Sequence, residues 1–395
     1  MKVSSVKTDQ RVERNVWNTH LGIKAYGSNN DYPQKILEIV SASGTGKSCL
    51  DIYNKFIIGE GFEDKALATT IVNSSKEKAN VLLAKCAKDL RNFNGFAILV
   101  KYSGLSLPAE FYNIPFEQCR IGINNSLEYT GQIAIHPDWT GITGRRFANS
   151  DVKWANVFNV QNAFKQIKEA GNPEKFIGQI YYFTSDGELE YPVSPFDPIV
   201  TDMLTEESVS TVKHRNAKYN FLPAGILVRK GLKLHTKDDG TIDPNDPYNQ
   251  EQLASAKMIE RMQGDNNAVK IWVVDVDADE EKPEFIPFST QNYDKMYELT
   301  EKTVQENIGK MFMIPPILRG VDVGAGFGAD LMNNAYDFMN SVTHGDRISL
   351  EQAFADLFEF FPTKFSNFTI APLTYITPVE KTSDKKETED DSVSN

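Results

Sequence analysis

The chain has 395 residues and a formal net charge of −12, with the apolar and charged fractions of an ordinary globular protein. This length allows two or more domains and a sizeable core. No apolar run reaches the about 18–20 residues of a membrane span, and the N-terminus lacks an apolar stretch like that of a signal peptide. The acidic balance excludes a high-affinity DNA binder but leaves open a protein along which DNA slides.

Cysteine and histidine usage gives no sign of a metal or cofactor. Cys49, Cys86 and Cys119 stand far apart, which predicts reduced, buried residues in a cytosolic compartment. The five histidines are scattered, without metal-ligand spacing and without a Ser/His/Asp context. We therefore expect no cofactor and no enzymatic activity.

The N-terminal part predicts an arm followed by two helices. Residues 1–30 are polar and loosely patterned, and the first helix begins at Asp31-Tyr32-Pro33. The helical pattern breaks at Ser41–Gly46 and resumes until Gly59-Glu60-Gly61. A turn between two helices is one interpretation of the break, with Ser43 or Thr45 capping the second helix.

A third helix and a sheet follow. Ser74 or Ser75 is the predicted cap of the helix, and Asn94-Gly95 ends it. The next segments have the β-branched and aromatic content and the turn punctuation of an antiparallel sheet, with a tight turn at Ser185-Asp186-Gly187. The predicted strands are Phe96–Tyr102, Ala109–Ile114, Arg120–Ile123, Leu127–His136, Val157–Val160, Gly178–Phe183 and Leu189–Val193. Residues 31–196 thus predict an α+β domain.

Two long helices flank a small α/β segment. The first helix spans Asp197–Asn220, with an acid at its N-cap and Pro198 at the first helical position, and the second spans Asn292–Met313. Each is about 30–35 Å long at about 1.5 Å per residue. The intervening segment predicts the strand Gly225–Val228, a helix over Gln250–Met262 and the strand Ala268–Val276. This order of elements is typical of a projecting hairpin and not of the core of a compact enzyme.

The C-terminal part begins with a glycine-rich loop after Pro315-Pro316. A helix starts at Ala329, is interrupted at Gly345, and resumes from Ile348 to Phe361. Phe368–Leu373 predicts a last strand. The tail from Glu380 has no apolar anchor and predicts disorder.

Three short motifs resemble ligand-binding loops. Gly44–Ser48 resembles the end of a phosphate-binding loop, but the first glycine is replaced by Ser41 and no strand precedes it. Gly324–Ala329 follows a double proline instead of the strand that a dinucleotide fingerprint requires. Asp275–Asp279 lacks the glycine and the final glutamate of a calcium loop.

The order of three longer motifs resembles the portal proteins of tailed bacteriophages, of the broad HK97-type group. The motifs are Tyr26–Pro33 with the helix that ends at Ile58–Phe62, the segment Asn220–Leu227 after the first long helix, and Met311–Gly320 after the second. Together they extend over residues 31–360.

This resemblance implies a homododecameric ring at a capsid vertex of the virion, assembled in the host cytoplasm, through which double-stranded DNA is packaged and ejected. It also implies contacts with the major capsid protein, the large terminase subunit and a head–tail adaptor, and none with a membrane. By position it implies an N-terminal arm (1–30), a wing (31–196), two stem helices (197–220 and 292–314), a clip (221–291), a tunnel loop (315–328), tunnel and crown helices (329–362), a strand returning to the wing (363–379) and an acidic disordered tail (380–395).

The resemblance places the loop Ile317–Gly328 against DNA. Candidate contacts in this loop are Arg319, Val321, Val323, Gly324, Gly326, Phe327 and Gly328, and on the first stem helix they are Lys213, Arg215 and Lys218. A buried connection without DNA contact is the alternative for the loop. For the whole chain the alternatives are a nucleotide hydrolase built on Gly44–Ser48 and another ring-forming head–tail connector.

Overall fold

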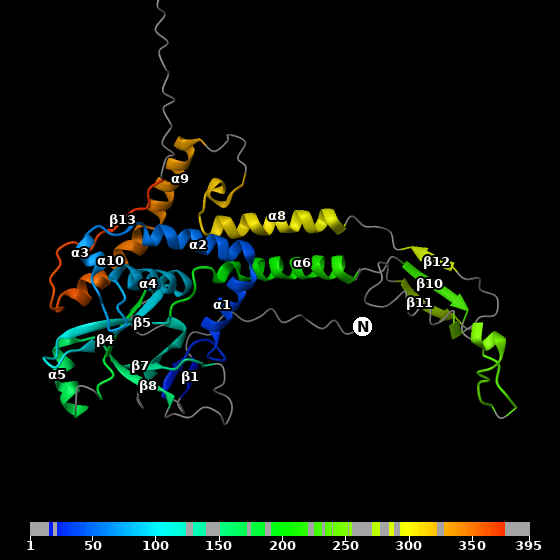
Figure 1. Ribbon diagram of the computed structural model, residues 1–395, viewed down its shortest axis with the longest axis horizontal. Coiled ribbons are helices and arrows are strands. Elements are labelled where there is room, and N and C mark those ends of the chain that lie inside the picture. The colour runs from blue at the N-terminus through cyan, green and yellow to red at the C-terminus, as the bar shows by residue number, and fades with distance from the viewer. Residues whose placement is uncertain are drawn as a thin grey trace, which may run out of the picture. The chain divides into compact units, whose positions relative to one another are not determined.

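The computed structural model describes residues 16–18, 22–123, 129–139, 151–171, 175–185, 191–219, 225–230, 234–238, 240–251, 253–254, 271–276, 284–287, 293–321 and 328–375. The chain forms two compact units (Figure 1). The first comprises Met1–Glu38, Ser48–Asp197 and Gly309–Asn395, and the second comprises Ile39–Lys47 and Pro198–Ile308. Helices and strands are both present throughout, which confirms the predicted α+β class.

An eight-stranded sheet forms the centre of the first unit. Its strands, in spatial order, are β1 (Val16–Asn18), β2 (Ile23–Ala25), β6 (Cys119–Ile123), β7 (Tyr129–Ile135), β8 (Lys153–Val157), β9 (Gln179–Thr184), β4 (Gly95–Tyr102) and β5 (Pro108–Ile114). The two N-terminal strands belong to the segment that the sequence predicts as an arm. Burial of Ile23 accounts for strand β2 in this segment, because Ile23 packs with Ala134 and Trp139.

The sheet is mixed, so the prediction of a purely antiparallel sheet is wrong at one place. β8 and β9 pair in parallel, and helix α5 (Val160–Glu169) connects them. Strand β8 therefore ends at Val157, which is the residue at which the predicted strand Val157–Val160 begins. Asn159 caps α5 by accepting a hydrogen bond from the backbone N of Gln161, which converts the end of the expected strand into a helix start.

Helices α1 (Tyr32–Ala42), α2 (Gly44–Ile58), α3 (Lys65–Thr69) and α4 (Ala79–Phe93) complete the N-terminal part. Lys78 is the N-cap of α4, so Ser74 and Ser75 do not cap this helix. The reason is a tight turn upstream, in which Lys76 has a positive φ of 60°. Asn94 ends α4 in the left-handed conformation, as predicted.

The C-terminal helices are α9 (Ala329–Val342) and α10 (His344–Phe358). Their break lies at Thr343 and not at Gly345, and the Thr343 hydroxyl donates to the carbonyl of Met339, 2.9 Å away. Such back-bonding by threonine competes with the helical hydrogen-bond ladder. The predicted last strand is short: β13 (Ile370–Ala371) pairs antiparallel with β3 (Gly61–Phe62).

Helix α6 (Val200–Tyr219) lies beside helix α8 (Tyr293–Met311) in the second unit, green and yellow in Figure 1. A 3-10 turn, Asp197–Ile199, precedes α6. The carboxylate of Asp197, the predicted cap, accepts a hydrogen bond from the hydroxyl of Tyr32 at 2.9 Å.

The second unit also contains a three-stranded sheet. β10 (Gly225–Lys230) is its centre, with β11 (Ile271–Val276) parallel on one side and β12 (Glu284–Pro287) antiparallel on the other. The sequence predicts the first two strands and misses β12. Of the helix predicted over Gln250–Met262, the structure describes helical residues at 247–251 and 253–254, so this helix begins earlier than expected.

Several predictions lie wholly or partly outside the described residues. Among them are the turn at Ser185-Asp186-Gly187, whose last two residues are not described, the tail from Glu380, and residues 189–190 of the expected strand Leu189–Val193. The remaining residues of this expected strand have no strand conformation.

Candidate functional site

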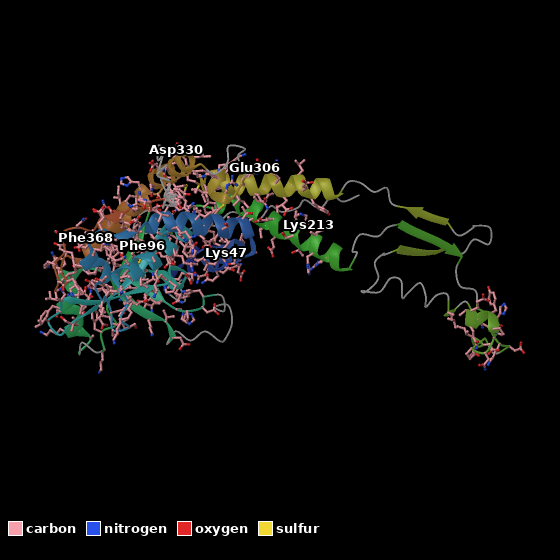
Figure 2. All side chains as sticks on the ribbon, turned by 45° about the horizontal axis from the view of Figure 1, so that its top comes forward. Lys47, Phe96, Lys213, Glu306, Asp330 and Phe368 are labelled. Atoms are coloured by element: carbon pink, nitrogen blue, oxygen red, sulfur yellow. The ribbon has the colours of Figure 1, made fainter. Side chains whose placement is uncertain are left out.

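The two long helices of the second unit carry the first group of candidate residues. An ion pair between the Lys213 ammonium on α6 and the Glu301 carboxylate on α8 joins them. Figure 2 labels Lys213 on α6. On α8, Val304 and Ile308 are 4% and 0% exposed, whereas Leu299 is 68% exposed. This helix therefore has one buried apolar stripe and an apolar residue outside it.

Charge is divided along α6. The acids Asp202, Glu206 and Glu207 lie in its first half, and Lys213, His214, Arg215 and Lys218 lie in its second half. This order complements the helix dipole, which favours anions at the N-terminus and cations at the C-terminus. Arg215 is exposed, and the side chain of Lys218 lies outside the described residues. The C-terminal half of α6 thus carries the basic residues Lys213, Arg215 and Lys218, of which Lys213 pairs with Glu301.

The start of α2, which contains the sequence Gly44–Ser48, is bound by a carboxylate from α6. Glu206 accepts hydrogen bonds from the hydroxyls of Ser43 and Thr45, the latter at 2.5 Å, and from the backbone N of Thr45 at 3.3 Å. Ser43 also caps α2 by accepting from the backbone N of Gly46 at 2.9 Å. Of the two caps proposed from the sequence, Ser43 thus performs the role.

Gly46 allows α6 to approach α2 this closely. A Cβ atom at this position would lie 2.8 Å from the Ser43 Oγ and 3.0 Å from the Cε of Met203. Helix α1 precedes this turn, Glu206 accepts from the backbone N of Thr45, and Ser43 accepts from that of Gly46. The geometry therefore differs from a phosphate-binding loop, which needs a strand upstream and free amides.

The second group of candidate residues belongs to the first unit. Pro316–Arg319 forms a 3-10 turn, where the sequence predicts a loop, and Gly320 ends it in the left-handed conformation. Val321 is 47% exposed, and Gly328 is the N-cap residue of α9. The other four candidates of the loop, Val323, Gly324, Gly326 and Phe327, lie outside the described residues.

Arg319 is half-buried and lies against the end of α8. A Cβ atom at Gly309 would stand 2.1 Å from Nη1 of Arg319, so the guanidinium covers this glycine directly. In this position the side chain is committed to packing on its own subunit. The structure thus describes Arg319, Val321 and Gly328 in one unit and Lys213 and Arg215 in the other.

Of the buried polar residues that sequence reasoning missed, two bear on the candidate sites. One is Glu206, which is 9% exposed and has no local sequence signal, since its partners are more than 160 positions away. The other is Asp89 on α4, which is 8% exposed. Asp89 falls on the apolar stripe of Leu82, Cys86 and Phe93 at helical spacing, and this pattern could have identified it as a buried acid.

Within the described residues, no group of three or more His, Cys, Asp or Glu side chains is arranged to hold a metal ion. The same residues include no helix that combines the length and the apolar character of a membrane span.

Comparisons with known proteins identify relatives by fold only. No protein-family profile and no curated protein matches the chain. Among solved structures, a chain in the neck of a native gene transfer agent particle, computed with twelve-fold symmetry, aligns with a TM-score of 0.51 and 13% identity over 84% of this chain and 82% of its own.

Two further structures are more distant. A chain from the neck of the empty particle, computed with six-fold symmetry, gives a TM-score of 0.48 at 13% identity over 88% of this chain and 84% of its own. A phage portal protein of the HK97 family from Corynebacterium diphtheriae gives 0.37 at 8% identity over 82% and 89%. The resemblance inferred from the sequence is confirmed at the level of the fold, which this chain shares with the subunit of the native neck.

Proposed function

We propose that this protein is a portal-type subunit of a phage-like particle, which assembles with copies of itself into a ring at the junction of head and tail. The observation that carries this proposal is the fold shared with a neck subunit over four-fifths of both chains. That structure was computed with twelve-fold symmetry, so a ring of twelve is the arrangement we propose here.

The long helices support assembly. Leu204 on α6 is 41% exposed and Leu299 on α8 is 68% exposed, although both belong to helices with buried apolar residues. Neighbouring copies in a ring would cover such residues, since a closed symmetric assembly buries the same two surfaces at every interface. Apolar area removed from water contributes about 25 cal/mol per Å², which favours the ring at high protein concentration.

The charge distribution supports a channel for double-stranded DNA. A net charge of −12 per subunit repels phosphates and opposes tight binding. The exposed cations on the second half of α6, Arg215 among them, would provide contacts to phosphates, which are weak and independent of sequence. The loop Ile317–Gly328 would line the narrowest part of the channel, where Val321 is an exposed apolar residue.

The remaining roles follow from the domain order proposed from the sequence. Residues 31–196 would form the wing and face the major capsid protein, and residues 221–291 would form the clip, where the large terminase subunit and later the head–tail adaptor dock. The protein would be a structural component of the virion without enzymatic activity, assembled in the host cytoplasm.

A pair of variants tests the assembly. Leu299→Glu places a charge on the exposed apolar site of α8, and Thr303→Glu places the same charge on an exposed polar site one turn away. Mass photometry over a concentration series should show rings for the parent and for Thr303→Glu, and mainly subunits for Leu299→Glu. Equal assembly of all three proteins would contradict the interface, and absence of rings in the parent under every condition would contradict the proposal itself.

A further inference from the structure

A cavity of about 330 Å³ lies beside α4 in the first unit. Its lining includes Lys85, Lys88, Asp89 and Asn92 from α4, Asn113 from β5 and Glu117 from the turn between β5 and β6. Most of its polar groups are therefore carboxylates and amides, with two lysines in addition.

The two innermost polar residues are Asp89 and Asn92. Asp89 is 8% exposed, and its Oδ2 accepts a hydrogen bond from Nδ2 of Asn113 at 3.1 Å. The backbone N–H of Phe116 also donates to this carboxyl group. Asn92 is 2% exposed, and within the described part of the chain its Oδ1 has no hydrogen-bond partner. A buried amide without a partner costs free energy, which a ligand with hydrogen-bond donors would recover.

The lysines are exposed and do not neutralise Asp89. Lys85 forms an ion pair with Glu77. Burial is the main cause that raises the pKa of Asp89 to about 7, and Glu117 acts in the same direction. The hydrogen bonds from Asn113 and from the Phe116 backbone, and the charge of Lys88, lower this pKa without reversing the shift. The thiols of Cys86 and Cys119, which also face Asp89, have pKa values raised by burial and are neutral at pH 7. The carboxyl group thus lacks the cation that would keep it ionised.

We propose that this cavity is a binding site for a cationic nitrogen group, a guanidinium or a primary ammonium, whose N–H groups donate to Asp89 and Asn92. A guanidinium offers up to five donors, and hydrogen bonds between charged partners are the stronger ones. The group comes either from a small free cation or from a basic side chain of a second copy of this chain. The first source does not depend on the function proposed above, since the small cation binds the separate subunit, whereas the second source rests on the assembly proposed there.

Calorimetric titration of dilute protein with arginine amide tests the first source. Because the pKa of Asp89 is about 7, part of the Asp89 carboxyls is protonated at neutral pH, so binding that ionises them releases protons, and this release disappears at pH 9. Two buffers with different ionisation enthalpies measure the protons. Asp89→Asn should weaken binding at least tenfold and abolish proton release, and Asn92→Ala should weaken binding severalfold. The control Asp51→Asn, at an exposed acid on α2, should bind like the parent.

Infrared difference spectroscopy at pH 6 tests the second source. A protonated carboxyl group gives a carbonyl band. The band that is present in the parent and absent in Asp89→Asn belongs to Asp89, so its intensity measures how much of Asp89 is protonated. If a neighbouring copy supplies the cation, this band is present in dilute subunits and disappears on assembly, and the assembled protein no longer takes up arginine amide. The proposal is overturned if arginine amide does not saturate the dilute protein and the band also survives assembly, or if Asp89→Asn and Asn92→Ala both bind like the parent.

Discussion

Replacing Glu206 by glutamine should loosen the junction of α2 with α6. The carboxylate accepts three hydrogen bonds, from two hydroxyls and one backbone amide of Ser43 and Thr45. Glutamine keeps the volume but removes the charge at the helix N-terminus, and its NH₂ group faces donors instead of acceptors. Hydrogen bonds to charged groups contribute about 1.5–3 kcal/mol each, and a charge at a helix terminus contributes about 0.3–1 kcal/mol.

Because the amide oxygen of glutamine retains part of this bonding, we expect a loss of about 2–3 kcal/mol in the free energy of unfolding of this junction. Chemical denaturation measures the loss, and hydrogen exchange of the amides at residues 43–47 localises it, since a chain of two units need not unfold in one step. The control is Glu207→Gln, at the exposed neighbouring acid, which should change both measurements little.

A double-mutant cycle with Ser43→Ala sharpens the test. Directly bonded residues couple by about 0.5–3 kcal/mol, whereas unconnected residues add. Additive effects of Glu206→Gln and Ser43→Ala, or identical exchange at residues 43–47 in the Glu206 and Glu207 variants, would refute the interpretation that Glu206 holds the start of α2.

Three other predictions concern single positions. Gly309→Ala should destabilise the first unit by about 1–3 kcal/mol in thermal unfolding, because the added Cβ would displace the guanidinium of Arg319. Gly345→Ala should instead stabilise α10 by up to about 1 kcal/mol, because no atom lies within 4 Å of the added Cβ. Asp89→Asn should remove a pH dependence: the pKa of Asp89 is about 7 when folded and about 3.9 when unfolded, so the folded chain binds more protons between these values, and its stability falls as pH rises through this window. In urea titrations, the free energy of unfolding of Asp89→Asn minus that of the parent should therefore grow from pH 4 to pH 7 and then level off. A difference that is constant over this range would contradict the raised pKa of a buried carboxyl group at Asp89. Arg215→Gln should leave assembly unchanged and reduce the retention of linear DNA by rings at low salt, and equal retention at all salt concentrations would argue against a phosphate contact on α6.

Elements with strong local signals were predicted well. The two long helices follow from their acids, prolines and apolar spacing, and the structure places them at Val200–Tyr219 and Tyr293–Met311. The left-handed Asn94 that ends α4 is likewise a local signal. In these segments the residues that decide the conformation are neighbours in the sequence.

Elements that depend on distant partners were missed. The parallel pairing of β8 with β9 requires α5, whose start at Asn159 and Val160 looks like the end of a strand. The strand β2 exists because Ile23 is buried under residues more than a hundred positions away. For the same reason no local pattern could reveal that Glu206 binds Ser43, or that Arg319 folds over Gly309 instead of extending from its loop. Periodicity reports which face of an element is buried but not what covers it.

The central claim is that copies of this chain close around a hollow axis. Electron microscopy of the purified protein at high concentration measures this directly. The proposal predicts top views of closed rings with a central opening and with twelve repeats. Single compact particles without an opening, at every concentration and salt condition at which the protein stays folded, would contradict it.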